Sequence, residues 1–153
     1  MNVKKDYEEL LRLLNKNKVK YCVVGAYAIA FYGRPRYTND IDILVEPDIK
    51  NADKVIKALN EFGFKSLKLS AGDFSKTGRI VQLGYEPLRI DIMTSIEGCG
   101  FTEIWNNRKR SKYGNEKIHF IGLKELIKNK KISNRKQDQA DLEILKERKQ
   151  VTP

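Results

Sequence analysis

Apolar residues recur along the first third of the chain with spacings that predict a helix, a strand and a second helix. The first apolar stripe consists of Tyr7, Leu10, Leu11 and Leu14. This i, i+3, i+4, i+7 spacing predicts an amphipathic helix over residues 4 to 16. Residues 21 to 24 are apolar throughout and are followed by Gly25. Such a run is typical of a buried strand that turns abruptly, here into an Ala-rich helix over residues 26 to 32.

Two later segments alternate between apolar and polar positions, which is the period of a strand with two distinct faces. Residues 40 to 45 read Asp-Ile-Asp-Ile-Leu-Val, so Asp40 and Asp42 are predicted to share one face. Residues 88 to 93 read Leu-Arg-Ile-Asp-Ile-Met. We therefore predict a second two-faced strand, with Asp91 on the side opposite to the apolar residues.

The remaining pattern alternates helices and strands, which indicates an α/β (α+β) domain. The further predicted elements are a helix from Ala52 to Phe62 closed by Gly63, strands at 79 to 83 and 117 to 121, a helix that starts at Leu123, and a last helix from about Asn134. The stretch around Trp105 is assigned to no element. On the last helix, Asp138 and Asp141 fall on the same face as Leu142 and Leu145. These two carboxylates are therefore expected to border the core.

Length and composition indicate a single domain. A chain of 153 residues can bury one sizeable core, so we expect one domain over residues 1 to 150. No apolar run approaches the roughly 20 residues that span a bilayer, and the N-terminus lacks the core of a signal peptide. We therefore expect a soluble, cytoplasmic protein with no membrane contact. Cys22 lies in an apolar run and Cys99 between two glycines, so both are expected to be reduced thiols.

Positive charge is concentrated towards the C-terminus. The chain has 30 Lys or Arg and 20 Asp or Glu, a formal net charge of +10. Residues 108 to 149 hold fourteen of these basic residues against six acidic ones. This surplus is compatible with two interpretations. It either attracts a polyanion through phosphate neutralisation and counterion release, or forms the solvated faces of helices.

The paired aspartates suggest a metal site. Carboxylates at i and i+2 on a strand project side by side, where they bind hard cations such as Mg²⁺. Without a cation, Asp40 and Asp42 would repel each other on an otherwise apolar strand, although such pairs also occur as caps or ion-pair partners. Gly25, at the turn into a helix, suggests that a phosphate binds at that helix N-terminus. The alternative is that Gly25 only permits a sharp turn.

Two segments together resemble the signature of small nucleotidyltransferases of the DNA polymerase β superfamily. The first is VVGAYAIAFYGRPRYTNDIDILV, which is similar to the motif hG-(G/S)-x-A followed by G-x-x-R-x-T-x-D-h-D, where h is apolar. The matching residues are Gly25, Ala28, Gly33, Arg36, Thr38, Asp40 and Asp42, with Asp91 as the expected third carboxylate. The second is ELIKNKKISNRKQDQADLEIL, which is similar to L-I-x-x-K, then G-R, then D-x-x-D-L. Lys130, Arg135, Asp138 and Asp141 fill the charged positions of that second motif.

The resemblance implies a nucleotidyltransferase fold, a small mixed β-sheet flanked by helices and completed by C-terminal helices. It also implies two Mg²⁺ ions, replaceable by Mn²⁺, and a nucleoside triphosphate such as ATP as substrate. Asp40 and Asp42 would bind both metals. Asp91 would bind the one that activates the acceptor hydroxyl, or take its proton. His119 is the only histidine, and because it lies in an Ile-His-Phe run we expect it to be structural.

The resemblance assigns the triphosphate to the turn and the loop at the start of the motif. Gly25 and Ala26 would lie against the phosphates. Arg36, supported by Arg34, would contact them with guanidinium groups, which suit phosphate geometry. Thr38 is either a phosphate contact or a local turn hydroxyl. Ala26 stands where the family has Gly or Ser, which removes a hydroxyl contact but keeps a backbone N–H.

The C-terminal motif admits two roles. Lys130 and Arg135 either clamp the triphosphate, oriented by Asp138 and Asp141, or form salt bridges that pack the last two helices together. Asn134 replaces the motif glycine, and asparagine adopts positive φ more readily than most residues.

The leading hypothesis is a metal-dependent transferase that moves a nucleoside monophosphate from a triphosphate to an acceptor hydroxyl. RNA such as tRNA, a protein and a small molecule are all open as acceptors. The relatives that share the signature include toxins of toxin–antitoxin pairs and antibiotic-modifying transferases. The alternative is a non-catalytic module that binds RNA or protein, or an antitoxin-like partner, on the same fold.

Overall fold

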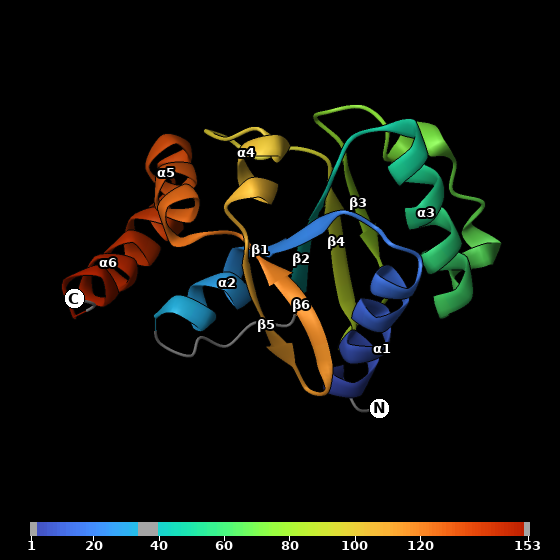
Figure 1. Ribbon diagram of the computed structural model, residues 1–153, viewed down its shortest axis with the longest axis horizontal. Helices are drawn as coiled ribbons and strands as arrows, with labels where there is room; N and C mark the ends of the chain where they lie inside the picture. Colours follow the sequence, from blue (N-terminus) through green and yellow to red (C-terminus); the bar gives the residue numbers. More distant parts are fainter. Residues whose placement is uncertain (1–2, 34–39, 152–153) are drawn as a thin grey trace.

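The computed structural model describes residues 3–33 and 40–151, in which helices lie against a sheet of six strands (Figure 1). The strands are β1 (Tyr21–Val24), β2 (Asp40–Val45), β3 (Ile80–Leu83), β4 (Arg89–Met93), β5 (Lys109–Tyr113) and β6 (Glu116–Phe120). The α-helices are α1 (Val3–Lys16), α2 (Gly25–Tyr32), α3 (Ile49–Leu59), α4 (Phe101–Asn106), α5 (Leu123–Ser133) and α6 (Lys136–Val151). Three short helical turns, η1 (Asn60–Phe64), η2 (Lys65–Leu67) and η3 (Ala71–Asp73), follow α3.

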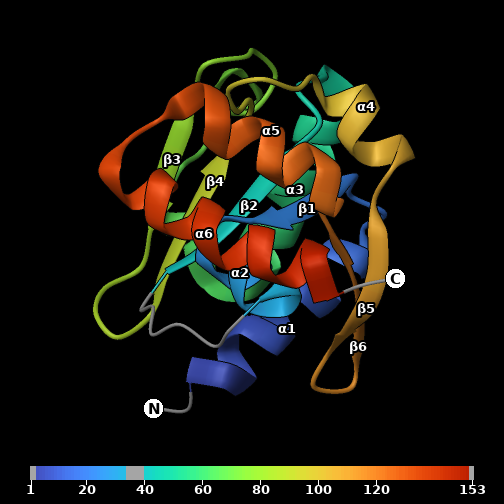
Figure 2. The ribbon, with the colours of Figure 1, turned by 90° about the vertical axis from the view of Figure 1, so that its left-hand side faces the viewer.

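The sheet is mixed, with the strand order β3-β4-β2-β1-β6-β5. The pairs β2–β4 and β1–β6 are parallel, whereas β1–β2, β3–β4 and β5–β6 are antiparallel. Figures 1 and 2 show α1 and α3 on one side of the sheet and α2, α5 and α6 on the other. The predicted fold class, a mixed sheet flanked by helices, is therefore confirmed.

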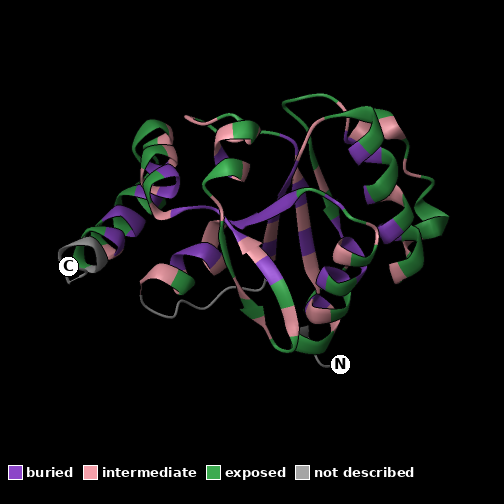
Figure 3. Ribbon diagram, in the orientation of Figure 1, coloured by how far each residue is buried: buried purple, intermediate pink, exposed green. Residues whose placement is uncertain are grey.

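The core follows the alternation of the two central strands. Ile41 and Ile43 of β2, and Ile90 and Ile92 of β4, are buried. The residues between them on both strands are only partly buried, so the burial colours alternate along the sheet in Figure 3. One face of these strands is thereby fixed in the core, and the aspartates are held on the opposite face.

Most predicted elements are present, and their ends differ by a few residues. Helix α2 begins at Gly25 itself, with φ +68°, one residue earlier than predicted. The last helix begins at Lys136 and not at Asn134, which ends α5 with φ +48°. The positive φ at Asn134 agrees with the expectation that asparagine can serve in place of the motif glycine.

Among the strands and α-helices, the sequence pattern did not predict α4 and β5. Strand β5 reads Lys-Arg-Ser-Lys-Tyr and lies at the edge of the sheet, so it has no continuous apolar face. Helix α4 has only six residues, one of which, Ile104, is buried. Neither gives a periodic signal because neither presents a full face to the core.

None of the helices in the described part of the chain is both long enough and apolar enough to cross a membrane. Cys22 and Cys99 are free cysteines, and Cys22 is buried.

Candidate active site

Two of the three predicted carboxylates lie side by side on neighbouring strands. Strands β2 and β4 pair in parallel with Asp42 directly beside Asp91. Residues in register on adjacent strands project to the same side of a sheet, so both carboxylates face away from the core. The sequence predicted that Asp91 would lie near the two aspartates of β2, and in the structure it lies beside one of them, Asp42.

Burial and mutual repulsion make this pair electrostatically strained. Burial, together with the charges of Asp91 and Asp40, raises the pKa of Asp42 to about 7. Burial and the charge of Asp40 likewise raise the pKa of Asp91. Asp91 Oδ1 is buried and accepts no hydrogen bond from the described residues. A carboxylate pair with an unsatisfied buried oxygen suits a divalent cation, which would supply both the missing contact and the opposite charge.

Asp40 shares the face of Asp42 but lies beside an arginine. Its register partner on β4 is Arg89, and Arg89 Nε lies 3.8 Å from Asp40 Oδ1. Among the described residues, no three His, Cys, Asp or Glu side chains are already grouped around one metal position. The three predicted aspartates are therefore not gathered around one metal position among the described residues, where Asp40 lies beside Arg89.

Gly25 brings the start of α2 against the carboxylate of Asp42. Val24, at the end of β1, lies opposite Asp42 on β2. A Cβ atom on Gly25 would lie 2.0 Å from Asp42 Oδ2, so only glycine leaves room for that oxygen. No side chain caps the N-terminus of α2. This end of the helix is thus open beside the aspartates, as a phosphate-binding turn requires, and Ala26 follows in the same first turn.

The aspartate pair and the C-terminal motif line one cleft of about 640 Å³. Strands and the turn of α2 contribute Val24, Gly25, Asp42, Ile80, Gln82, Asp91 and Met93, and Arg79 directly precedes β3. Loops and helix α5 contribute Gly78, Ser95, Ile96, Glu97, Asn129, Lys130 and Ser133, and Arg135 follows α5. Figure 2 shows α5 and α6 in front of the sheet. The two motifs, far apart in sequence, therefore meet across this cleft.

Lys130 is the centre of a buried ion-pair network. Its Nζ lies 3.1 Å from Asp138 Oδ1 and 3.3 Å from Asp141 Oδ2. Both aspartates are buried, as predicted from their position on the leucine face of α6. Ser133 Oγ also donates to Asp138 Oδ2 at 2.7 Å. The network joins α5 to α6 and holds one buried cation at the edge of the cleft.

Arg135 belongs to the same network but remains open to solvent. Its Nε lies 3.0 Å from Asp138 Oδ2, and its side chain is 75% exposed. Burial alone would raise the pKa of Asp138, but hydrogen bonds from Arg135, Ser133 and Lys130 bring it well below its usual range. Asp138 therefore stays ionised and orients Arg135 at the rim of the cleft. The salt-bridged packing of the last two helices, one of the two alternatives from the sequence, is therefore present, and the triphosphate clamp stays a prediction.

Four further residues of the first motif are not among the described residues that line the cleft. Arg34, Arg36 and Thr38 lie outside the described residues. A Cβ on Gly33 would lie 2.2 Å from Ile144 Cγ2 on α6. This motif glycine therefore permits close packing of α2 against the last helix.

His119 does not line the cleft. Its ring centroid lies 5.1 Å from that of Trp105 and 5.4 Å from that of Tyr21, and its Nδ1 accepts a hydrogen bond from Arg108 Nε at 3.3 Å. Burial and the charges of Arg108 and Arg110 lower its pKa to about 4. A neutral, packed ring agrees with the structural role expected for His119.

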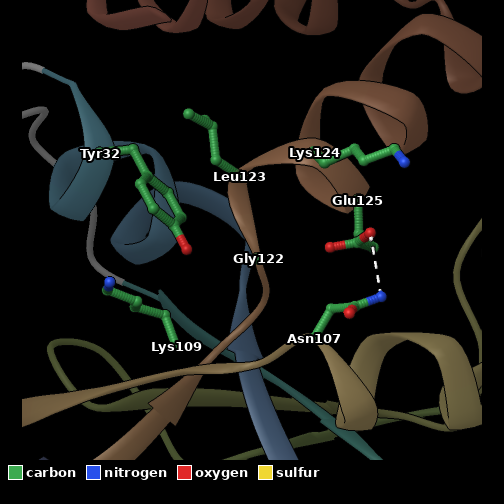
Figure 4. A pocket seen from close by; sticks show the side chains of 7 residues that line it. All are labelled: Tyr32, Asn107, Lys109, Gly122, Leu123, Lys124 and Glu125. Atoms are coloured by element: carbon green, nitrogen blue, oxygen red, sulfur yellow. Dashed lines mark hydrogen bonds between the residues drawn. The ribbon is translucent and has the colours of Figure 1, made fainter. Parts of the chain in front are cut away.

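Sequence reasoning missed several cleft residues, notably Arg79, Ile80 and Gln82 of the β3 region. No motif marks them, because they reach the cleft only through the pairing of β3 with β4. A second, smaller pocket of about 390 Å³ shares no lining residue with the cleft. It lies around Tyr32, Lys109 and Glu125, where Glu125 accepts a hydrogen bond from Asn107 Nδ2 at 3.4 Å (Figure 4).

Three solved structures with the same fold are described as nucleotidyltransferases or as nucleotidyltransferase-like. A lincosamide antibiotic adenylyltransferase, solved with lincomycin bound, is 19% identical, with a TM-score of 0.57 over 93% of this chain and 95% of that chain. A nucleotidyltransferase from Thermotoga maritima, described as putative, is 16% identical, with a TM-score of 0.57 over 94% of this chain and 89% of that one. An antigenic nucleotidyltransferase-like protein from Paracoccidioides brasiliensis is 15% identical, with a TM-score of 0.57 over 94% and 74% of the two chains. These likenesses show the fold.

A search of curated protein sequences gives no match. A family model does match: "Nucleotidyl transferase of unknown function (DUF2204)", over residues 3–152. Because this match extends over nearly the whole chain, the protein belongs to this nucleotidyl transferase family and is an enzyme of that class.

Proposed function

We propose that the protein transfers a nucleoside monophosphate from a nucleoside triphosphate to an acceptor hydroxyl, with divalent metal ions held by Asp42, Asp91 and Asp40. The observation that carries this proposal is the register of Asp42 beside Asp91, together with the buried Asp91 Oδ1, which accepts no hydrogen bond from the described residues. Burial and the neighbouring charge of Asp91 raise the pKa of Asp42 to about 7, and a cation bound by both carboxylates would favour their ionised forms.

Mg²⁺ is the preferred metal because carboxylate oxygens are its usual protein ligands, and Mn²⁺ is expected to replace it. When bound, such ions neutralise the charge that develops on the phosphate oxygens and lower the pKa of the acceptor hydroxyl. The acceptor oxygen forms a bond to the α-phosphorus while the bond from that phosphorus to the bridging oxygen breaks. Pyrophosphate leaves, and the hydroxyl proton passes to Asp91 or to water.

The chain's own cations and backbone would bind the triphosphate. The open N-terminus of α2 at Gly25 and Ala26 offers backbone N–H groups beside Asp42. Across the cleft, Lys130 and Arg135 provide positive charge that Asp138 and Asp141 hold in place. We assign Arg34, Arg36 and Thr38 to the same task on the strength of the sequence motif alone.

The proposal includes three classes of acceptor and two biological roles. RNA such as tRNA, a protein and a small molecule each offer a hydroxyl. A small-molecule acceptor has a parallel in the similarly folded adenylyltransferase that was solved with lincomycin bound. A toxin of a toxin–antitoxin pair and a resistance enzyme would both use this chemistry.

Calorimetric titration with each nucleoside triphosphate, with and without Mg²⁺, tests the nucleotide site. We expect binding that requires Mg²⁺ and is lost in Asp42→Asn and Asp91→Asn. Asp53→Asn is the matched control, because Asp53 is exposed on α3 and does not line the cleft. Equal binding by wild type, Asp42→Asn and Asp91→Asn would overturn the proposed metal ligands.

Transfer itself is tested with triphosphates labelled at the α-phosphate. The protein is incubated with Mg²⁺ and a cell extract, which is then separated into nucleic acid, protein and small molecules. Label in one fraction, absent with Asp42→Asn, is expected and identifies the acceptor class. A protein that binds triphosphate but labels no fraction would instead be a non-catalytic member of the fold.

A further inference from the structure

The order of the strands gives the aspartate pair two distinct sides. The sheet runs β3-β4-β2-β1, so Asp91 on β4 lies between Asp42 on β2 and the strand β3. The turn at Gly25, to which we assign the triphosphate, follows β1 on the side of Asp42. Strand β3 lies on the side of Asp91, about 10 Å from β2 at the usual strand spacing. The cleft extends to both sides of the pair, because Gly25 and residues of β3 line it together.

An in-line displacement gives these two sides different tasks. The acceptor oxygen must approach the α-phosphorus from the side opposite to the leaving pyrophosphate. When the pyrophosphate lies at the turn of Gly25, that opposite side is β3. The acceptor would then lie over β3 and β4, with its hydroxyl at Asp91. The side chains that these two strands present to the cleft therefore indicate the chemistry of the acceptor.

One face of β3 and β4 forms this part of the cleft. Ile80 lies directly opposite Met93, and Gln82 lies directly opposite Asp91. Directly opposed residues of an antiparallel pair project to the same side, so these four side chains share a face, and all four line the cleft. Strand β3 reads Ile-Val-Gln-Leu and contributes no charge. We refer to Ile80 and Met93 as the apolar platform.

Ile80 differs from the other exposed apolar residues in its position. In the described part of the chain six large hydrophobic side chains are exposed, and among them only Ile80 lines the cleft. Single exposed apolar residues are common on protein surfaces. Small-molecule sites, however, combine apolar walls with a few polar groups that fix the orientation of the ligand. Ile80, Met93 and Gln82 provide this combination directly beside Asp91.

The charged residues near the platform do not form a surface for a polyanion. Arg79 directly precedes β3, and Glu97 lies in the loop after β4. Both are exposed and both line the cleft, so one positive and one negative charge stand at this end of it. A polynucleotide requires several cations along its backbone. The platform therefore suits an uncharged acceptor better than a nucleic acid.

We infer that the apolar platform binds the acceptor, and that the acceptor is an uncharged small organic molecule with an apolar face next to its hydroxyl. This inference rests on the proposed function, because it selects one acceptor class for that same reaction. The apolar face would contact Ile80 and Met93, and the amide of Gln82 would hydrogen-bond a polar group of the acceptor. The cleft, at about 640 Å³, lies within the usual range of small-molecule sites, about 300–1,000 Å³.

NMR of the methionine methyl groups tests the platform without relying on turnover. The chain has two methionines, Met1 and Met93, so ¹³C-methyl labelling gives two signals, and Met93→Leu identifies the one from Met93. The probes are primary alcohols from ethanol to hexanol, added to protein that is saturated with Mg²⁺ and a non-hydrolysable ATP analogue. We expect the Met93 signal to shift, with an affinity that rises by up to about fourfold for each CH₂ group that the platform covers.

Ile80→Thr is the test variant, and Ile49→Thr is its matched control. Both isoleucines are 65% exposed, but Ile49 begins α3, on the other side of the sheet, and does not line the cleft. Ile80→Thr keeps a β-branched side chain and removes apolar contact. We expect it to bind hexanol about 10-fold more weakly and to depend less on the length of the alcohol. Ile49→Thr should bind all the alcohols like the wild type.

Charged and polymeric probes distinguish the other acceptor classes. Hexanoate and hexylamine should bind about 10-fold more weakly than hexanol, because the platform would remove their charges from water. A short RNA with a free 3′ hydroxyl and a serine-containing peptide should leave the Met93 signal in place. The inference is overturned if the alcohols do not shift this signal, or if Ile49→Thr loses as much affinity as Ile80→Thr. Tighter binding of hexanoate, RNA or peptide than of hexanol would also overturn it.

Binding at the platform and nucleotidyl transfer can fail separately. Transfer of labelled nucleotide to hexanol that is lost in both Asp42→Asn and Ile80→Thr would support both proposals. Transfer to RNA or protein by an enzyme whose Met93 signal does not respond to alcohols would count against this inference alone. Alcohol binding by a protein that binds no triphosphate would count against the proposed function, and with it against the platform as an acceptor site.

Discussion

Replacing Gly25 with alanine should displace the carboxylate of Asp42 and lower nucleotide binding much more than it lowers the free energy of unfolding. The change adds one methyl group at the turn between β1 and α2, and it changes no charge. That methyl would lie 2.0 Å from Asp42 Oδ2, whereas Cβ atoms essentially never approach another atom within 3.0 Å. The carboxylate must therefore move by about 1 Å, because its neighbour is the backbone of a helix that cannot easily give way.

A displacement of this size is sufficient to abolish efficient catalysis. A misplacement of about 1 Å at a catalytic group can lower the rate about 100-fold. The positive φ of Gly25, +68°, adds backbone strain of about 1–2 kcal/mol for an L-residue. We therefore expect Gly25→Ala to lose Mg²⁺-dependent nucleotide binding and transfer, while its free energy of unfolding falls by only about 1–2 kcal/mol.

Urea unfolding and calorimetric titration with Mg²⁺ and triphosphate measure the two effects. Gly63→Ala is the control, because Gly63 also has positive φ, +123°, but its added Cβ would meet no atom within 4 Å. This control should lose stability and keep nucleotide binding. Wild-type nucleotide binding by Gly25→Ala would refute the assignment of Asp42 to a site that depends on this contact.

Three further changes test the surroundings of the site. Lys130→Met removes the buried cation that Asp138 and Asp141 share and should lower the free energy of unfolding by about 3–5 kcal/mol in urea, whereas exposed Lys131→Met should change it little. His119 should titrate with a pKa of about 4 in a proton NMR series. Because that value is lower than in the unfolded chain, the contribution of His119 to stability should fall as pH drops from about 6.5 to about 4, and it is measured as the difference between the wild type and His119→Gln, since Asp42 with its raised pKa acts in the opposite direction. Gly33→Ala should destabilise the protein through Ile144, and the double variant with Ile144→Ala should recover part of the loss in thermal melting. A His119 pKa near 6.5 would contradict the packing described for His119. A Gly33→Ala/Ile144→Ala variant that recovers no stability would contradict the contact between Gly33 and Ile144.

Local sequence patterns were sufficient for the strands that carry the carboxylates. Alternation in residues 40 to 45 and 88 to 93 depends only on which positions face the core, and the structure buries the same isoleucines that the pattern selects. The same argument placed Asp138 and Asp141 on the leucine face of α6, where both are buried. Periodicity succeeds in these elements because each presents one complete face to the core.

Local patterns could not predict elements or contacts that depend on distant partners. Strand β5 has no apolar face, and it is a strand because β6 supplies its hydrogen bonds. Gly33 is adjacent to Ile144 only because α2 packs against α6. The pairing of Asp40 with Arg89 likewise follows from the register of β2 with β4, which no single segment contains.

The sequence by itself determined the two-faced strands, the glycine turn and the two charged motifs, because these depend on neighbours within a few residues. Only the tertiary structure decided that Asp42 lies beside Asp91 and that Lys130 faces the same cleft. The physical reason is that strand order and register are set by packing of the whole core, which brings together residues that are remote in the chain.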